Sequence, residues 1–494
     1  MRRLSRRLYT LAMYLAMPVI LYRLAFRGLR NRGYFSRWLE RFGWFADPGF
    51  ASSIWVHAVS VGEFNAAIPL IQELMRRHPD QPLVVTTITP TGSDRVLKQF
   101  GDRVFHVYLP YDLPAAIERF FARVKPRIAV VMETEIWPNL YFACQAHGIP
   151  IFIANARLSE RSLKGYGPAI SLIGDAVRCA TLVAAQSQVD GERFLRLGAS
   201  PERMRVVGNI KFDMAVPGGL DEVAREWRET WGALRPVWIA ASTHEGEEAA
   251  VLQAHARILG RFPDALLILV PRHPERFRAA ISLCRSYGFR TSCRSEDHIA
   301  SLDSQCFVVD TMGELLKFYA CADACFVGGS LDRIGGHNVL EPAALRKPIL
   351  IGPHTFNFAE ITDTLVAEDA AVRVANGAAL GSQVVRILSD PRRAAAMGAA
   401  ALAVVERERG AVPRTLAAIE EILAVTTPGA EPPVVRLARR AYVTAPRVTV
   451  GADLLRELFA LCGSGFIPRK LSRSKSAPTK STTNGTFGAN ALRT

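Results

Sequence analysis

The stretch SIWVHAVSVGEFNAAIPLIQEL, residues 53–74, decides the fold class, because an apolar run gives way within a few residues to helical spacing. Residues 53–59 are typical of a buried strand, and the apolar residues that follow Gly62 recur as on one face of a helix. Glu63 lies at the corner, where the carboxyl end of a strand in an open α/β sheet faces a possible ligand crevice. Its carboxylate is expected either to act on a ligand or to cap the helix that starts there.

Similar strand-and-helix units recur along both halves of the 494-residue chain. The sequence predicts strands within residues 54–60, 83–89, 103–110, 127–135, 149–156, 181–187 and 204–208, and then within 237–243, 265–271, 306–310, 324–329 and 347–352. Apolar strands that alternate with helices indicate parallel sheets covered on both faces. The fold class is therefore α/β, with two Rossmann-like domains facing a cleft. Both GT-B glycosyltransferases and sugar-nucleotide epimerases have this arrangement.

The predicted domain boundaries follow from these patterns. We expect a membrane anchor at 1–30, an N-terminal Rossmann-like domain at 31–215, a C-terminal Rossmann-like domain at 216–427 and a basic tail at 428–494, largely disordered toward its end. No GxGxxG follows the first strand, and no GxxxxGK[ST] occurs anywhere, which argues against NAD-binding and P-loop proteins.

The net charge of +15 comes from the two ends of the chain. Residues 1–46 contain ten arginines and one acid, and residues 430–494 contain eleven lysines and arginines and three acids. The body between them is nearly neutral, so we expect no nucleic-acid partner. The eight cysteines include no CxxC pair and have no histidine at zinc-finger spacing, which predicts buried thiols in a reducing cytoplasm, without a bound metal.

The amino terminus combines an apolar run, residues 8–22, with arginines on both sides. The run is short for a span of about 20 residues, and Pro18 is expected to interrupt it. Because no small-x-small cleavage site follows, we predict a retained anchor that either lies in the membrane or spans it marginally. A helix of the protein core is the alternative.

Polar residues follow the predicted strands in both halves. Glu133 and Glu135 end the run at 127–135, and only one of them is expected to face the cleft. In the second half STHEGEE (242–248) follows a strand and can open a helix whose free N–H groups accept an anion. Arg272 and Glu341 suit a phosphate and ribose hydroxyls, respectively. Each of these residues can also be an ordinary turn or cap residue, but together they favour a nucleotide site with backbone N–H donors.

Seven motifs together resemble the 3-deoxy-D-manno-octulosonic acid (Kdo) transferases of lipopolysaccharide assembly. They are HAVSVGE, METEIWPN, NARLSERS, GNIKFD, PRHPERF, TMGEL and GGHNVLEP, and the likeness runs from about Arg32 to about Glu421. The resemblance implies an inverting GT-B enzyme of the bacterial inner membrane, on its cytoplasmic face. It implies CMP-Kdo as donor and the lipid A precursor, a tetraacyl disaccharide 1,4′-bisphosphate, as acceptor.

The same resemblance assigns roles to individual residues. Glu63 becomes the general base, and Glu133 and Lys211 become the residues that support the transition state. Glu63 is expected to be ionised at neutral pH, because a helix start does not raise a carboxyl pKa. With no Asp-x-Asp motif, we expect neither a metal nor another cofactor. The implied CMP contacts are Pro271, Arg272, Met312, Gly313, Glu314, Asn338, Val339, Leu340 and Glu341.

Two other functions fit parts of this pattern. One keeps the fold and changes the reaction, to a UDP-sugar lipid glycosyltransferase or a sugar-nucleotide epimerase. The other is a membrane-tethered nucleotide-binding protein without catalysis. Transfer from a UDP-sugar without use of CMP-Kdo would distinguish the first from a Kdo transferase. A folded protein that shows no transfer would favour the second.

Overall fold

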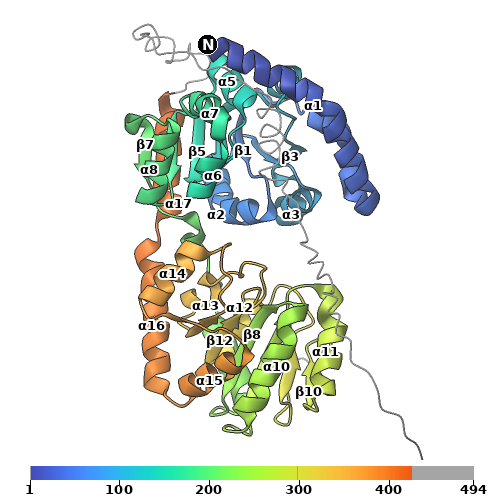
Figure 1. The fold of residues 1–494 in the computed structure, drawn as a ribbon, viewed down its shortest axis with the longest axis vertical. Helices are drawn as coiled ribbons and strands as arrows, with labels where there is room; N and C mark the ends of the chain where they lie inside the picture. The colour runs from blue at the N-terminus through green and yellow to red at the C-terminus, as the bar shows by residue number, and fades with distance from the viewer. Residues whose placement is uncertain (1, 298, 426–494) are drawn as a thin grey trace, which may run out of the picture.

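The computed structural model describes residues 2–297 and 299–425, so the predicted tail at 428–494 lies outside the described residues. Figure 1 shows two lobes, each built around a sheet, and these confirm the predicted pair of Rossmann-like domains. Each sheet has seven strands, and every pair of neighbouring strands is parallel.

The N-terminal sheet has the strand order β3-β2-β1-β4-β5-β6-β7. Its strands are β1 (Ser53–His57), β2 (Leu83–Thr87), β3 (Phe105–Tyr108), β4 (Pro126–Met132), β5 (Ile151–Ala156), β6 (Leu182–Ala185) and β7 (Met204–Val206). One face is covered by α4 (Pro114–Val124), α5 (Pro138–Ala146), α7 (Ile170–Val177) and α8 (Gln188–Leu197). The other is covered by α2 (Val61–Arg77), α3 (Pro90–Phe100) and α17 (Ala411–Val425). The apolar runs are therefore continuous because both faces are buried.

The C-terminal sheet has the order β10-β11-β9-β8-β12-β13-β14. Its strands are β8 (Val237–Thr243), β9 (Leu266–Pro271), β10 (Thr291–Cys293), β11 (Cys306–Val308), β12 (Ala324–Val327), β13 (Ile349–Ile351) and β14 (Ala371–Arg373). Helices α10 (Glu245–Leu259), α11 (Phe277–Ser286) and α15 (Gly377–Leu388) cover one face. Helices α9 (Leu220–Trp231), α12 (Leu315–Cys321), α13 (Leu340–Ala344), α14 (Ala359–Ala367) and α16 (Pro391–Glu408) cover the other. The strands β10 and β14 were not predicted.

Each sheet has one point where the strand order reverses. In the N-terminal sheet the chain leaves β1 toward one edge and returns beside it as β4, and in the C-terminal sheet β12 returns beside β8 in the same way. Ligands of open α/β sheets bind outside the carboxyl ends of the strands at such a reversal. The loops that follow β1, β4, β8 and β12 are therefore where the fold favours a site.

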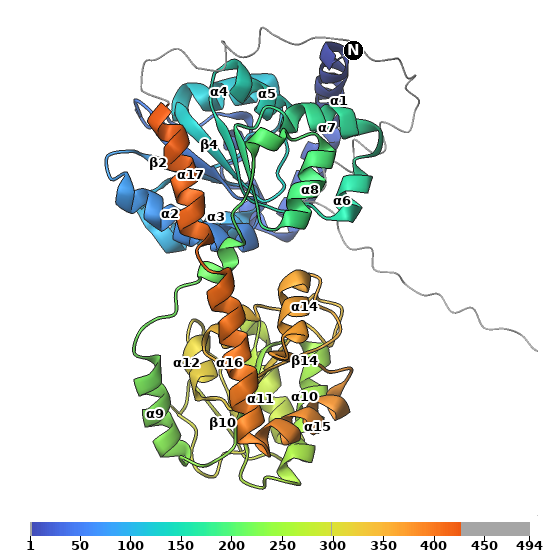
Figure 2. The ribbon, with the colours of Figure 1, turned by 90° about the vertical axis from the view of Figure 1, so that its left-hand side faces the viewer.

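The chain crosses between the domains twice. The first crossing is the short helix η6 (Ile210–Asp213): Ile210 packs in the N-terminal core and Phe212 in the C-terminal core. The second follows α16, after which α17 returns to pack against α2, as Figure 2 shows. The Asp213 carboxylate joins the two crossings, because it accepts hydrogen bonds from the backbone N–H of Gly410 at 2.6 Å and of Val412.

The first helix, α1 (Arg2–Arg30), lies along the N-terminal domain. Among the described residues it is the one helix long and apolar enough to cross a membrane, by length and composition. The Tyr9 hydroxyl donates to Asp112 Oδ2 at 2.8 Å, and Thr10 Oγ1 donates to Asn139 Oδ1 at 2.9 Å, so one side of α1 is attached to the body. The expected interruption at Pro18 is wrong, because the helix continues through it.

Candidate active site

Glu63 is held at the start of α2 by hydrogen bonds within its own loop. Ser60 is the N-cap, and its hydroxyl oxygen accepts from the Glu63 N–H at 3.3 Å. The Glu63 carboxylate accepts two hydrogen bonds from the same loop. Its Oε1 accepts from the Ser60 hydroxyl at 3.0 Å, and its Oε2 accepts from the Val59 N–H at 2.8 Å. Each carboxylate oxygen offers two lone-pair sites, so both oxygens keep one for a further donor. The side chain is thus a cap, and it can still take a proton.

The ionisation of Glu63 differs from the expectation drawn from its helix position. Burial raises its pKa to about 8, and the negative charges of Glu135 and Glu133 add to the rise, while the hydrogen bonds from Val59 and Ser60 lower it. The expectation of a carboxyl that is ionised throughout the neutral range is therefore wrong. Desolvation of the charged form outweighs the helix start.

Glu133 and Glu135 follow β4 on the other side of the strand reversal. Glu133 has a left-handed backbone, with φ of 56°, so the alternation of an extended strand ends at Met132. Both glutamates raise the pKa of Glu63, and the extended backbone from which a single cleft-facing acid was expected does not continue to Glu133. Glu135 is mostly buried, which raises its pKa to about 7 in spite of a hydrogen bond of 3.1 Å from the indole N–H of Trp137 to Oε2.

Lys211 brings a positive charge to these carboxylates. Its Nζ lies 3.4 Å from Glu133 Oε1, and both side chains are about four-fifths buried, with exposures of 21% and 20%. The same Nζ lies 5.7 Å from the centre of the Phe358 ring, which belongs to the C-terminal domain. Lys211 lies on η6, the first crossing between the domains, so the ion pair of the N-terminal domain lies beside a residue of the C-terminal domain. The structure therefore brings Glu63, Glu133 and Lys211 together.

The loop after β12 is held by a residue that the sequence did not single out. Glu247, buried in the first turn of α10, accepts backbone N–H bonds from Gly329 at 2.6 Å, and from Ser330 and Leu331 at 2.8 Å each. These three backbone amides are therefore already satisfied and are not free to donate to a phosphate. The signal in the sequence was a Glu three residues after the helix cap, as in a capping box.

Three histidines gather beside this loop. His244 Nε2 lies 2.8 Å from His337 Nε2, so one proton is shared between the two rings. The His273 ring packs edge-on to His244, with centroids 5.2 Å apart. Burial, and next the charge of Arg272, lower the pKa of His337 to about 3. Arg272 itself is exposed, and among the described residues its guanidinium has no carboxylate partner.

Of the other residues expected at a CMP site, some are exposed, and others are buried or already bound to another side chain of the protein. Met312 and Gly313 are exposed after β11, whereas both oxygens of Glu314 are bound by Arg294 at 2.8 and 3.0 Å, which lowers the Glu314 pKa to about 2. Glu341 accepts from Asn338 Nδ2 at 3.1 Å, and burial raises its pKa. Pro271, Val339 and Leu340 are buried, so any contact from Val339 or Leu340 would come from the backbone.

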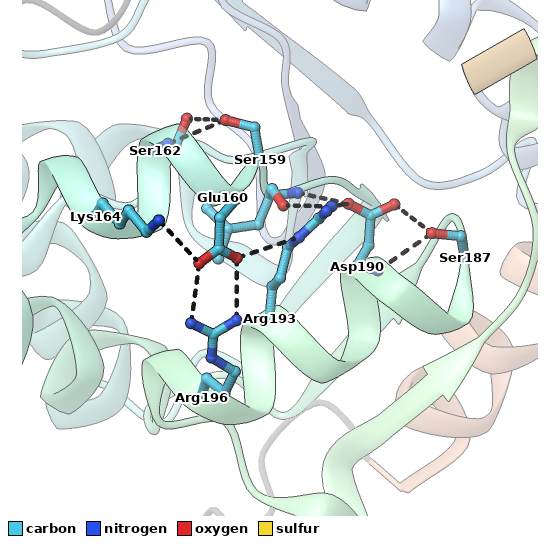
Figure 3. A network of polar contacts seen from close by, with 9 residues as sticks. Ser159, Glu160, Ser162, Lys164, Ser187, Asp190, Arg193 and Arg196 are labelled. Carbon is cyan, nitrogen blue, oxygen red and sulfur yellow. Dashed lines mark hydrogen bonds and ion pairs between the residues drawn. The ribbon is translucent and has the colours of Figure 1, made fainter. Parts of the chain in front are cut away.

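The NARLSERS stretch supports the site from a distance. Figure 3 shows Asp190 on α8 accepting from Ser187, and Glu160 contacting Arg193 and Arg196. Asp190 Oδ1 also accepts from the backbone N–H of Leu158 at 2.9 Å. These contacts fix the loop after β5 to α8. Within the described residues, no group of three or more His, Cys, Asp or Glu could hold a metal ion.

Comparison with known proteins identifies the family. Residues 36–214 match the family described as 3-Deoxy-D-manno-octulosonic-acid transferase (kdotransferase). The 3-deoxy-D-manno-octulosonic acid transferase of Haemophilus influenzae is 40% identical over 83% of this chain and 96% of its own length. The chain belongs to the Kdo transferase family. It is therefore an enzyme, a glycosyltransferase.

Two further proteins extend the comparison. The Kdo transferase family member from Bordetella pertussis is 36% identical over 85% of this chain and 100% of its own length. A solved structure of UDP-GlcNAc 2-epimerase from Neisseria meningitidis is 13% identical, with a TM-score of 0.51 over 76% of this chain and 99% of that chain. At such low identity the epimerase shares the GT-B-like fold alone.

Proposed function

We propose that the chain transfers Kdo from CMP-Kdo to the lipid A precursor, a tetraacyl disaccharide 1,4′-bisphosphate, with inversion and with Glu63 as general base. One observation carries the proposal. A mostly buried carboxyl with a pKa of about 8 lies at the β1–β4 reversal, in a chain of the Kdo transferase family. A base whose pKa is near the operating pH is the most effective proton acceptor.

The reaction follows from these groups. A hydroxyl of the acceptor attacks the anomeric carbon of Kdo, and its proton passes to the Glu63 carboxylate. The bond from that carbon to the CMP phosphate oxygen breaks, so CMP leaves with the bonding electrons. Lys211, which pairs with Glu133 at 3.4 Å, is a largely buried cation, and in a closed site such a charge stabilises the leaving phosphate by several kcal/mol. Glu133 orients Lys211 through their ion pair.

The C-terminal domain would bind the donor. Arg272 offers an exposed guanidinium to the phosphate, and Glu341 and Asn338 offer oxygens and an amide to the ribose and base. The exposed loop of Met312 and Gly313 is open for a further contact with the donor. Glu314 would position Arg294 through their ion pair rather than contact the donor directly. This assignment keeps the CMP contacts implied by the family resemblance, with Pro271, Val339 and Leu340 shaping the wall.

We also propose that α1 holds the enzyme on the cytoplasmic face of the inner membrane. The side of α1 turned away from the body exposes Leu4, Leu11, Leu15, Tyr22 and Leu29, each more than half exposed. Arginines flank this apolar face at both ends of the helix. An apolar face with a basic border favours a helix that lies in the interface beside an anionic lipid acceptor.

Mass spectrometry of the products tests the proposal. Purified full-length enzyme is given the lipid A precursor with CMP-Kdo, and in parallel with UDP-glucose and UDP-N-acetylglucosamine. We expect a mass increase by one or more Kdo units with CMP-Kdo alone. Transfer from a UDP-sugar, with no use of CMP-Kdo, would overturn it.

A further inference from the structure

An apolar cavity lies between α1 and the N-terminal domain. Its empty space is about 830 Å³, open solvent at its mouth included. Helix α1 contributes Met13, Ile20 and Leu24, and the body contributes Ile88, Leu109 and Trp137. The lining contains no acidic residue. Apart from two arginines the lining is mainly apolar, which suits a hydrocarbon chain.

The wall of this cavity is connected to the candidate catalytic carboxylates on two sides. The indole N–H of Trp137, a lining residue, donates to Glu135 at 3.1 Å. On the other side the backbone N–H of Ile88 donates to the Val59 carbonyl at 3.4 Å, and the Val59 N–H in turn donates to Glu63 at 2.8 Å. A ligand that fills the cavity therefore lies one side chain, Trp137, away from Glu135, and it is connected to Glu63 through the backbone of Ile88 and Val59.

Two arginines give the cavity a positive charge. Arg23 is exposed and lines the cavity from α1, and Arg41 lines it from the body with an exposure of 2%. Arg41 donates from Nη2 to the Ile88 carbonyl at 2.9 Å, and its buried Nε has no hydrogen-bond partner among the described residues. Apolar walls with two guanidinium groups complement a lipid whose headgroup carries phosphate.

We propose that this cavity holds one acyl chain of the acceptor lipid, so that the acceptor's sugar hydroxyl is positioned at Glu63. The inference rests on the proposed function and adds the part of the substrate that the enzyme would recognise. A chain leaving the bilayer beside the exposed apolar side of α1 would enter the cavity on the same helix's buried side. The occupant is the acceptor itself, because the connection to Glu135 and Glu63 links the cavity to the reacting group.

A chain-length series on the full-length enzyme tests the proposal. Acceptors with progressively shorter acyl chains are presented in one detergent at constant mole fraction, and kcat/KM is measured with CMP-Kdo. Each methylene seated in the cavity is expected to change kcat/KM by about fourfold, which corresponds to about 0.8 kcal/mol. Ile20→Trp fills the cavity from α1 and is expected to flatten this dependence. Tyr14→Trp, on the same helix at 47% exposure and outside the cavity lining, is the matched control and keeps the wild-type slope.

Photo-crosslinking gives a second readout that does not depend on a variant's folding. An acceptor with a diazirine on an acyl chain is expected to label wild-type enzyme within residues 13–24 and 109–111 or at Trp137. The inference would be overturned if kcat/KM depended equally on chain length in the wild type and in Ile20→Trp, or if labelling were confined to other segments. If the wild type still transfers Kdo in that case, the proposed function stands. A wild type that transfers no Kdo to any acceptor would overturn both.

Discussion

Glu63→Gln is the substitution that probes the proposed mechanism most directly. The amide fits the same place, because its oxygen can accept from the Val59 N–H and its NH₂ group can donate to the Ser60 hydroxyl oxygen. It cannot accept a proton from the acceptor. Loss of a positioned general base typically costs between about 10² and 10⁴ in rate, so we expect kcat to fall by that factor.

The same substitution is expected to stabilise the protein at alkaline pH. The rise in the Glu63 pKa from 4.5 to about 8 sets an upper limit of about 5 kcal/mol, at about 1.36 kcal/mol per pKa unit. Because Glu63 and Glu135 interact, part of this energy belongs to the ionisation of Glu135. We therefore expect a destabilisation of about 2–3 kcal/mol from Glu63 itself. The folded-state pKa is the higher one, so the destabilisation is absent below the unfolded pKa near 4.5, grows as the pH rises and is complete above about 8. Glu63→Gln removes it.

Two measurements examine this reasoning. Wild-type kcat is expected to rise with pH up to about 8 and then level, because the base must be ionised. Thermal unfolding of Glu63→Gln is expected to show a gain of several degrees over wild type at about pH 9 and almost none at about pH 5. Glu73→Gln, at a partly exposed position on the same helix, is the control and should change neither. A Glu63→Gln enzyme that keeps more than about a tenth of wild-type kcat would refute the assignment.

Four further substitutions have expected outcomes. Lys211→Met should lower kcat by about 10² or more with a small change in donor KM, measured by CMP release, because the charge acts on the leaving phosphate. Arg272→Met should instead raise the KM for CMP-Kdo by about tenfold, and an unchanged KM would remove Arg272 from the donor site. Glu247→Ala should release three backbone amides and raise the donor KM at unchanged acceptor KM, with limited proteolysis within 328–338 as the readout. Tyr9→Phe should lower unfolding stability by about 1.5–3 kcal/mol in denaturant titration, because α1 loses a buried bond to a carboxylate.

The sequence determined the fold class and the places where chemistry is expected. All seven N-terminal strands were predicted. Strands β1 to β6 are runs of mostly buried residues, whereas β7 is mostly exposed and was predicted from the apolar residues of MRVVG. Two C-terminal strands, β10 at Thr291–Cys293 and β14 at Ala371–Arg373, were missed. Each is three residues long and partly exposed, so neither forms an apolar run, and each is a strand because β11 or β13 pairs with it.

The tertiary structure decided the state of the catalytic groups. The position of Glu63 at a strand-to-helix corner was readable from the sequence, but its pKa depends on burial and on Glu135, which lies 72 positions further along the chain. The strand reversal brings these carboxyls together, since β4 returns beside β1. Glu247 was not singled out for the same reason: its partners follow β12, and only the folded sheet places that loop over α10. Local patterns fix secondary structure, whereas desolvation and charge proximity arise only from packing between distant segments.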